Sequence, residues 1–138
     1  MRIGVPREVR DGERLVAATP RTVERLRALG YEVVVEHDAG AGATFSDAAY
    51  EAAGAAVVDA ATAWGADVGR AVNAPAGARG ALLRPGATLV AMLGPANDPD
   101  LVRRLADHGV TALALDAVPR ISRAQALDVL STLSNVAG

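Results

Sequence analysis

Short apolar runs alternate with amphipathic stretches along most of the chain. Runs that are apolar throughout are typical of strands buried on both faces of a parallel sheet. The predicted strands are Arg2 to Val5, Tyr31 to Glu36, Ala55 to Val58, Asp67 to Val72, Ala87 to Leu93 and Val110 to Leu115. The fourth of these is the least regular because it contains Gly69.

Capping residues indicate where helices begin and end between these strands. A side-chain oxygen before the first turn satisfies free backbone amides, and glycine is common just after the last turn. The predicted helices open at Thr19 with Pro20, at Ser46 and at Asp98 with Pro99, and they end at Gly30, Ala53 and, after His108, Gly109. Strands alternating with such helices predict an α/β fold over residues 1–138 as one domain. We expect a doubly wound, mainly parallel sheet of Rossmann-like or flavodoxin-like type, with helices on both faces and ligands at the carboxyl ends of the strands.

The last segment, Val118 to Gly138, reads VPRISRAQALDVLSTLSNVAG and has two faces of different chemistry. Drawn as a helix from Ser122, it has a polar stripe opposite an apolar face. The stripe holds Gln125, Asp128, Ser131, Thr132 and Asn135, and the apolar face holds Ala126, Leu127, Val129, Leu130, Leu133, Val136 and Ala137. The stripe carries one formal charge in a chain with 14 basic and 16 acidic residues, which predicts a face that contacts something. A merely polar, solvated helix face is the alternative interpretation.

Composition and charge narrow the class of protein. The chain has 138 residues, of which 51% are hydrophobic and 22% charged, as expected for one globular domain. Its net charge of −2, without a basic cluster, makes nucleic acid or an anionic membrane a poor partner. The lack of cysteine and lysine excludes disulfides, thiol catalysis and Schiff-base chemistry. No apolar run approaches the roughly 20 residues that cross a bilayer, so we expect a cytoplasmic chain without direct membrane insertion.

A Gly-x-Gly segment, Gly40 to Phe45, follows the second predicted strand. Its context is that of a dinucleotide fingerprint, but the third glycine position holds Phe45, which does not fit close packing of a helix on the strand. We interpret the segment as a turn that needs positive φ and not as a phosphate cradle.

Five other side chains near strand or helix ends suggest chemistry only weakly. His37 and His108 have no second histidine or carboxylate at metal-ligand spacing, so we expect no metal site and interpret both as structural or exposed. Glu8, Asp11 and Glu13 form an acidic loop, which we interpret as a solvated turn.

The residues after the last predicted strand lie where a ligand site is more strongly expected. Asp116 ends this strand, where its carboxylate is expected to accept hydrogen bonds from backbone amides. Arg120 and Arg123 follow at the edge where parallel sheets bind ligands, so they are either surface charges or ligand-binding side chains.

Five segments occur in one order along the chain: MRIGVPRE, VAATPRTVERLRALGYEV, GAGATFSDAAYEAAGA, VNAP and VPRISRAQALDVLSTLSNVAG. Together they resemble the first half of the NAD(H)-binding module in the alpha subunit of proton-translocating NAD(P) transhydrogenase, over the whole chain. Alanine dehydrogenases share the shorter segments. RISRAQ, followed by Asp and Ser at helical spacing, resembles only the transhydrogenase branch.

The resemblance implies roles for the residues after Pro119. The loop over the nicotinamide end of NAD(H) would be formed by Arg120, Ile121, Ser122, Arg123 and Gln125. Gln125 would bridge toward NADP(H) on the partner subunit, with Arg120 as the second catalytic residue, while Asp128 and Ser131 would bind the nicotinamide and ribose region. The implied partners are a second NAD-binding domain, absent here and expected after Gly138, the transhydrogenase beta subunit and a second copy in a homodimer. The assembled complex would lie peripheral to the inner membrane.

Three positions depart from the dehydrogenase pattern. Alanine dehydrogenases place an arginine, a lysine and a histidine where this chain has Leu15, Ala71 and Gly94, and Arg14 is one residue away from the arginine position. Carboxylate binding needs a fixed cation and imine chemistry needs a proton relay, whereas hydride transfer between two nicotinamides needs neither. The resemblance therefore favours transfer between NAD(H) and NADP(H), coupled to proton translocation in the full complex.

Two alternative functions stay open. One is an alanine dehydrogenase-like amino-acid oxidoreductase. The other is a non-catalytic fragment or pseudo-enzyme that acts as a protein-interaction module, since transhydrogenases usually keep the arginine and lysine as well.

Overall fold

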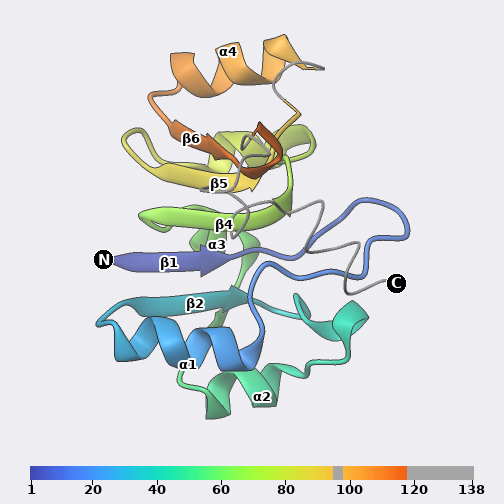
Figure 1. Ribbon diagram of the computed structural model, residues 1–138, viewed down its shortest axis with the longest axis vertical. Helices are drawn as coiled ribbons and strands as arrows, with labels where there is room; N and C mark the ends of the chain where they lie inside the picture. The colour runs from blue at the N-terminus through green and yellow to red at the C-terminus, as the bar shows by residue number, and fades with distance from the viewer. Residues whose placement is uncertain (95–97, 118–138) are drawn as a thin grey trace, which may run out of the picture.

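The computed structural model describes residues 1–94 and 98–117 and contains a six-stranded sheet, parallel between all neighbouring strands (Figure 1). The strands are β1 (Arg2–Val5), β2 (Glu32–Glu36), β3 (Ala56–Val58), β4 (Val68–Asn73), β5 (Thr88–Met92) and β6 (Thr111–Ala114). Their order is β3-β2-β1-β4-β5-β6, which is that of the Rossmann fold and not of the flavodoxin fold. The predicted parallel α/β sheet is confirmed. No strand begins or ends more than one residue away from its predicted bound.

Three of the helices begin at the predicted caps. They are α1 (Pro20–Ala28), α2 (Asp47–Ala52), α3 (Ala60–Trp64) and α4 (Pro99–Asp107), with short 3-10 helices η1 (Ala41–Ala43), η2 (Gly77–Leu82) and η3 (Leu115–Ala117). Thr19, Ser46 and Asp98 accept hydrogen bonds from backbone amides in the first turns of α1, α2 and α4, as predicted. The prediction missed α3 and η2, which connect β3 to β4 and β4 to β5.

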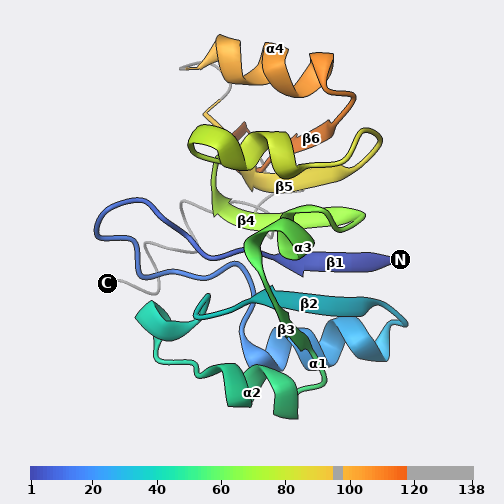
Figure 2. The ribbon, with the colours of Figure 1, turned by 180° about the vertical axis from the view of Figure 1, so that it is seen from behind.

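Helices lie on both faces of the sheet, as expected. α1 packs on β2 and α2 packs on β3, in the lower part of the molecule in Figure 1. The core on this side includes Val5, Val23, Val35 and Tyr50. Seen from behind in Figure 2, α3 and the yellow-green η2 cross the sheet. With α4 they bury a second cluster that includes Trp64, Leu83, Leu89, Leu101 and Leu105.

The front face of β4, β5 and β6 is different. In β4 and β5, side chains that alternate toward the back of the sheet are buried, whereas those toward the front are only half-buried. The front-facing residues include Val68, Arg70, Thr88, Val90, Met92, Thr111 and Leu113, and the two in β6 are exposed. Among residues 1–94 and 98–117, no α-helix forms a core cluster with this face, so within these residues the expected burial on both faces holds only for the other half of the sheet. No helix in the same part of the chain is long and apolar enough to span a bilayer.

Candidate functional site

β1 and β4 begin the two halves of the sheet, and the carboxyl ends of such a strand pair form the usual ligand crevice of this fold. Here Glu8, in the loop after β1, occupies the crevice. Its carboxylate accepts hydrogen bonds from the backbone amides of Val72, at 2.6 Å, and of Asn73, at 3.3 Å. The Asn73 side-chain amide donates to Glu8 at 3.2 Å and to Glu13 at 2.8 Å.

The interpretation of this acidic loop as a solvated turn is therefore wrong for Glu8 and Glu13. Asn73 is buried, with 7% of its surface exposed, and joins the two carboxylates. The hydrogen bond from Asn73, followed by the one from the Leu15 amide, lowers the pKa of Glu13 below its ordinary value. The crevice therefore holds two acidic groups and its strand-end amides are occupied, an arrangement that disfavours a phosphate at this point.

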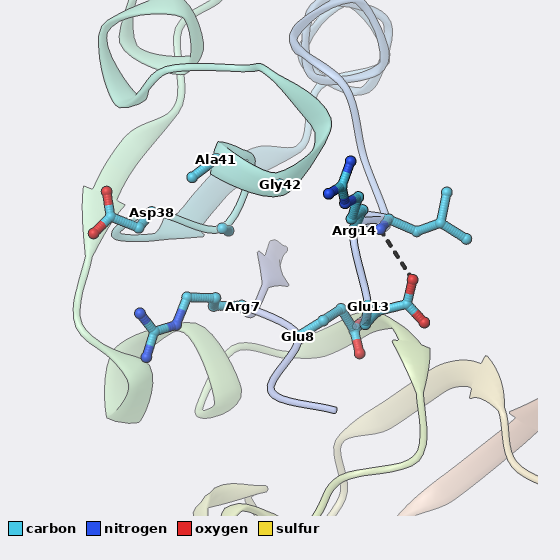
Figure 3. A pocket seen from close by; sticks show the side chains of 9 residues that line it. Arg7, Glu8, Glu13, Arg14, Asp38, Ala41 and Gly42 are labelled. Atoms are coloured by element: carbon cyan, nitrogen blue, oxygen red, sulfur yellow. Dashed lines mark hydrogen bonds between the residues drawn. The ribbon is translucent and has the colours of Figure 1, made fainter. Parts of the chain in front are cut away.

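A cavity of about 450 Å³ opens beside the crevice (Figure 3). It is lined by Arg7, Glu8, Glu13, Arg14 and Leu15 from the loop after β1 and by Asp38, Ala39, Ala41 and Gly42 from the segment after β2. Figure 3 shows that the guanidinium groups of Arg7 and Arg14 point apart. The two cations therefore do not form a clamp for a single carboxylate.

The buried Glu36 holds the loop after β1, which lines this cavity, in place. Glu36, at the end of β2, accepts a hydrogen bond from the Arg7 backbone amide at 2.7 Å and from the Arg79 guanidinium at 3.1 Å. Its side chain is 7% exposed, so the two partners compensate for the burial of its charge. The contact joins the β1 loop to η2, which sequence reasoning did not predict.

The segment from Gly40 to Phe45 forms η1 and the turn that leads to α2. The amides of Ala43, Thr44 and Phe45 donate to carbonyls of the same segment, which supports its interpretation as a turn without a phosphate cradle. The turn needs positive φ, as predicted, but it does so at Thr44 (67°), and at Asp38 (61°) before it, and not at its glycines. Gly40 is required by close packing instead, because a Cβ there would lie 2.6 Å from a ring carbon of Tyr50.

Three single side chains have clear surroundings. Asp116 accepts hydrogen bonds from the backbone amides of Leu93, at 3.0 Å, and Gly94, at 2.7 Å, as the sequence predicted. His108 is the C-cap of α4 and its ring bonds the Leu83 carbonyl, so its structural interpretation is confirmed. His37 is exposed, as one of its two interpretations had it, but the expectation that no carboxylate lies at metal-ligand spacing is wrong, because Asp38 and Asp47 both contact its ring.

The three departures from the dehydrogenase pattern lie in different surroundings. Leu15 is 43% exposed and lines the cavity, next to Arg14. Ala71 is buried in the cluster behind the sheet. Gly94 follows β5 with a φ of 55°, a conformation that disfavours a histidine or any other residue with a Cβ.

The predicted cofactor-binding residues lie outside the described residues. These are Arg120, Ile121, Ser122, Arg123, Gln125, Asp128 and Ser131, together with the predicted helix that carries them. The described chain before them ends in η3, which packs on β5 and is held there by Asp116. Ala117, where the described chain ends, is therefore close to the carboxyl edge of the sheet.

Comparison with known proteins covers nearly the whole chain. The profile of the family described as "Alanine dehydrogenase/PNT, N-terminal domain" matches residues 4–137. Over 138 residues the chain is 47% identical to the NAD(P) transhydrogenase subunit alpha of Haemophilus influenzae, covering all of this chain and 27% of that protein. It is 39% identical over 139 residues to the alanine dehydrogenase of Bacillus subtilis, covering all of this chain and 36% of that protein.

A solved structure has the same fold. The crystal structure of transhydrogenase from Sinorhizobium meliloti superposes with a TM-score of 0.94 and 37% sequence identity, over 99% of this chain and 41% of that chain. The chain thus spans about a quarter to two fifths of the length of these relatives.

Proposed function

The chain belongs to the family of alanine dehydrogenase/PNT N-terminal domains, and from this membership we propose that it is part of a transhydrogenase alpha subunit that transfers hydride between NAD(H) and NADP(H). The observation that carries the proposal is the similarity along the whole chain to transhydrogenase alpha subunits, at 47% identity for the Haemophilus influenzae protein. In the full complex this transfer is coupled to proton translocation.

The surroundings of Leu15, Ala71 and Gly94, where the chain departs from the dehydrogenase pattern, support hydride transfer over amino-acid oxidation. A keto-acid needs a cation for its carboxylate, but exposed Leu15 and buried Ala71 supply none. Imine chemistry needs a proton donor near the carbonyl, and Gly94 has no side chain. Hydride transfer between two nicotinamide rings needs them held face to face in a dry site, without a proton relay.

We assign NAD(H) binding mainly to a second nucleotide-binding domain of the same subunit. Two features of the described chain support this: the amides of Val72 and Asn73 in the β1 and β4 crevice are bonded to Glu8, and three amides of the Gly40 segment are bonded within it. These amides are not free to receive a pyrophosphate. This chain would then contribute the loop that covers the nicotinamide, called the lip below, which includes Arg120, Ile121, Ser122 and Arg123.

Within that lip, Gln125 is assigned to bridge toward NADP(H) on the beta subunit, and Asp128 and Ser131 to bind the nicotinamide and ribose region. The place of Asp116 supports this assignment, because its hydrogen bonds hold η3, the last described element before this segment, at the carboxyl edge of the sheet. A homodimer of the full subunit, peripheral to the membrane, completes the proposal.

The test measures two activities of the full-length subunit assembled with its beta subunit. We expect hydride transfer from NADH to an NADP(H) analogue and no NADH oxidation with pyruvate and ammonia. Pyruvate-dependent turnover would overturn the proposal in favour of the dehydrogenase alternative, for which Arg14 in the cavity wall is the available cation. If a folded, assembled complex showed neither of the two activities, the non-catalytic interaction module would be favoured.

A further inference from the structure

His37, Asp38 and Asp47 form a cluster at the carboxyl end of β2, called the β2 cluster below. One ligand atom from each residue lies within 4.8 Å of the others. Within residues 1–94 and 98–117, no other group of three histidine or acidic side chains comes as close. The mechanism of the proposed function does not use any of these three residues.

Asp47 fixes the orientation of the His37 ring. One oxygen of Asp47 contacts Nδ1 of His37, and the other accepts a hydrogen bond from the Asp38 backbone amide at 3.0 Å. Asp47 is the first residue of α2 and its side chain is only 22% exposed, so it is a firm anchor. An Nδ1–H donated to this carboxylate leaves the lone pair on Nε2, which is the tautomer found in carboxylate–histidine–metal sites.

Asp38 lies on the other side of the ring. Its carboxylate oxygen is 3.5 Å from Nε2 of His37, close to the roughly 3.3 Å between neighbouring ligand atoms around a tetrahedral zinc ion. The side chains of His37 and Asp38 are more than half exposed, so water can complete the coordination. An imidazole nitrogen beside a carboxylate oxygen favours zinc, nickel or copper over magnesium or calcium.

We propose that the β2 cluster binds a divalent late first-row transition metal ion through Nε2 of His37 and the carboxylate of Asp38. Asp47 is the positioning residue, which holds the ring through Nδ1. Because Asp38 also lines the cavity in Figure 3, the ion adds positive charge at the cavity rim, and Asp47 links the metal-bound ring to the start of α2.

The test titrates the chain with Zn²⁺ by calorimetry and with Co²⁺ by proton NMR of the histidine rings. The chain has two histidines, so His37 and His108 are separate reporters in one sample. We expect one Zn²⁺ ion to bind per chain, and Co²⁺ broadening of His37 at concentrations that leave His108 sharp. The variants His37→Gln and Asp38→Asn should lose the site, and Asp47→Ala should weaken binding by about 10- to 100-fold.

His108→Gln is the matched control, because it removes the other imidazole, which bonds the Leu83 carbonyl, and should leave Zn²⁺ affinity unchanged. Thermal unfolding without metal identifies any variant that has lost the fold, and His37→Gln, at an exposed side chain, is the variant expected to keep it. Equal Zn²⁺ affinity of the unmodified chain and a folded His37→Gln variant would overturn the proposal. Equal Co²⁺ broadening of both histidines, or of neither, would also overturn it and leave an ordinary histidine–carboxylate ion pair.

Discussion

At the scale of the residue, Asn73 holds two carboxylates together at the β1 and β4 crevice. Its side-chain amide donates to Glu8 and Glu13, so the two acids share a neutral donor instead of a cation. An amide donor stabilises the charged form of a carboxylate and is itself unaffected by pH. An uncharged neighbour is therefore the largest single stabiliser of the Glu13 charge.

The substitution Asn73→Ala tests this link. The Asn73 hydrogen bond is the largest cause of the low pKa of Glu13, so this pKa should rise toward its ordinary value of 4.5 in the variant. A carboxyl whose pKa is depressed in the folded state contributes stability above its unfolded pKa and loses it as the pH falls through the folded pKa. The variant should thus be less stable at neutral pH and lose less further stability below pH 4.5, as acid titrations of the free energy of unfolding would measure.

Asp59 is the internal control for this experiment. Its pKa is lowered by Thr62 at the start of α3 and not by Asn73, so NMR titration should give the same Asp59 pKa in both proteins. An unchanged Glu13 pKa in Asn73→Ala would show that the Leu15 amide, and not Asn73, stabilises the charge.

At the scale of the element, α3 crosses behind β1 so closely that only glycine fits at Gly4. A Cβ at this position would lie 1.9 Å from the Ala63 carbonyl oxygen and 2.9 Å from the Ala66 Cβ. The neighbours are helix backbone and a buried side chain, which cannot rotate away. The short α3 is therefore positioned by a residue in a strand far from it in sequence.

Gly4→Ala should lower the free energy of unfolding by about 1–3 kcal/mol or more, because α3 must move away from β1. Denaturant unfolding measures this change. Gly80→Ala in η2 is the matched control, since its nearest neighbour would be 3.9 Å away and its φ is not in the left-handed region. Equal stability of both variants would mean that α3 can move without cost.

The sequence predicted those elements whose determinants are local. Thr19, Ser46 and Asp98 each cap a helix by accepting a hydrogen bond from a backbone amide three residues further on. Short apolar runs identify the strands. In contrast, α3 has five residues, too few for a helical period, although its cap Asp59 could have indicated it. The contact of Glu8 with Asn73 joins residues 65 apart, so it depends on the strand order, which the pattern left open between two folds.

At the scale of the whole molecule, the described carboxyl ends of β1, β2 and β4 disfavour a phosphate. Glu8 and Glu13 place negative charge in the crevice, and the Gly40 segment uses its own amides. We therefore expect the 138-residue chain to bind NAD(H) with a Kd no lower than about 1 mM, which corresponds to a binding free energy of ~4 kcal/mol. Calorimetry with the chain alone measures this value, and micromolar affinity would contradict it.

The last prediction concerns the assembled enzyme, in which Gln125 and Arg120 are assigned different tasks. Gln125→Ala should slow hydride transfer between NADH and an NADP(H) analogue with little change in NADH affinity, because it removes an interaction formed mainly when the two nicotinamides meet. Arg120→Ala should instead weaken NADH binding, since a charge-assisted hydrogen bond contributes roughly 1.5–3 kcal/mol. Single-turnover rates and equilibrium NADH binding, measured for both variants, separate the two effects.

Arg103→Ala is the control for removal of a positive charge, because Arg103 is exposed on α4 and paired only weakly, at 3.7 Å, with Asp100. It should change neither the rate nor the affinity. If Gln125→Ala lowered NADH affinity as much as Arg120→Ala does, Gln125 would be a binding residue for NAD(H) and not the bridge to the second nucleotide. If Arg120→Ala slowed transfer at saturating NADH without weakening binding, the charge would act on the transition state, and the two roles would have to be exchanged.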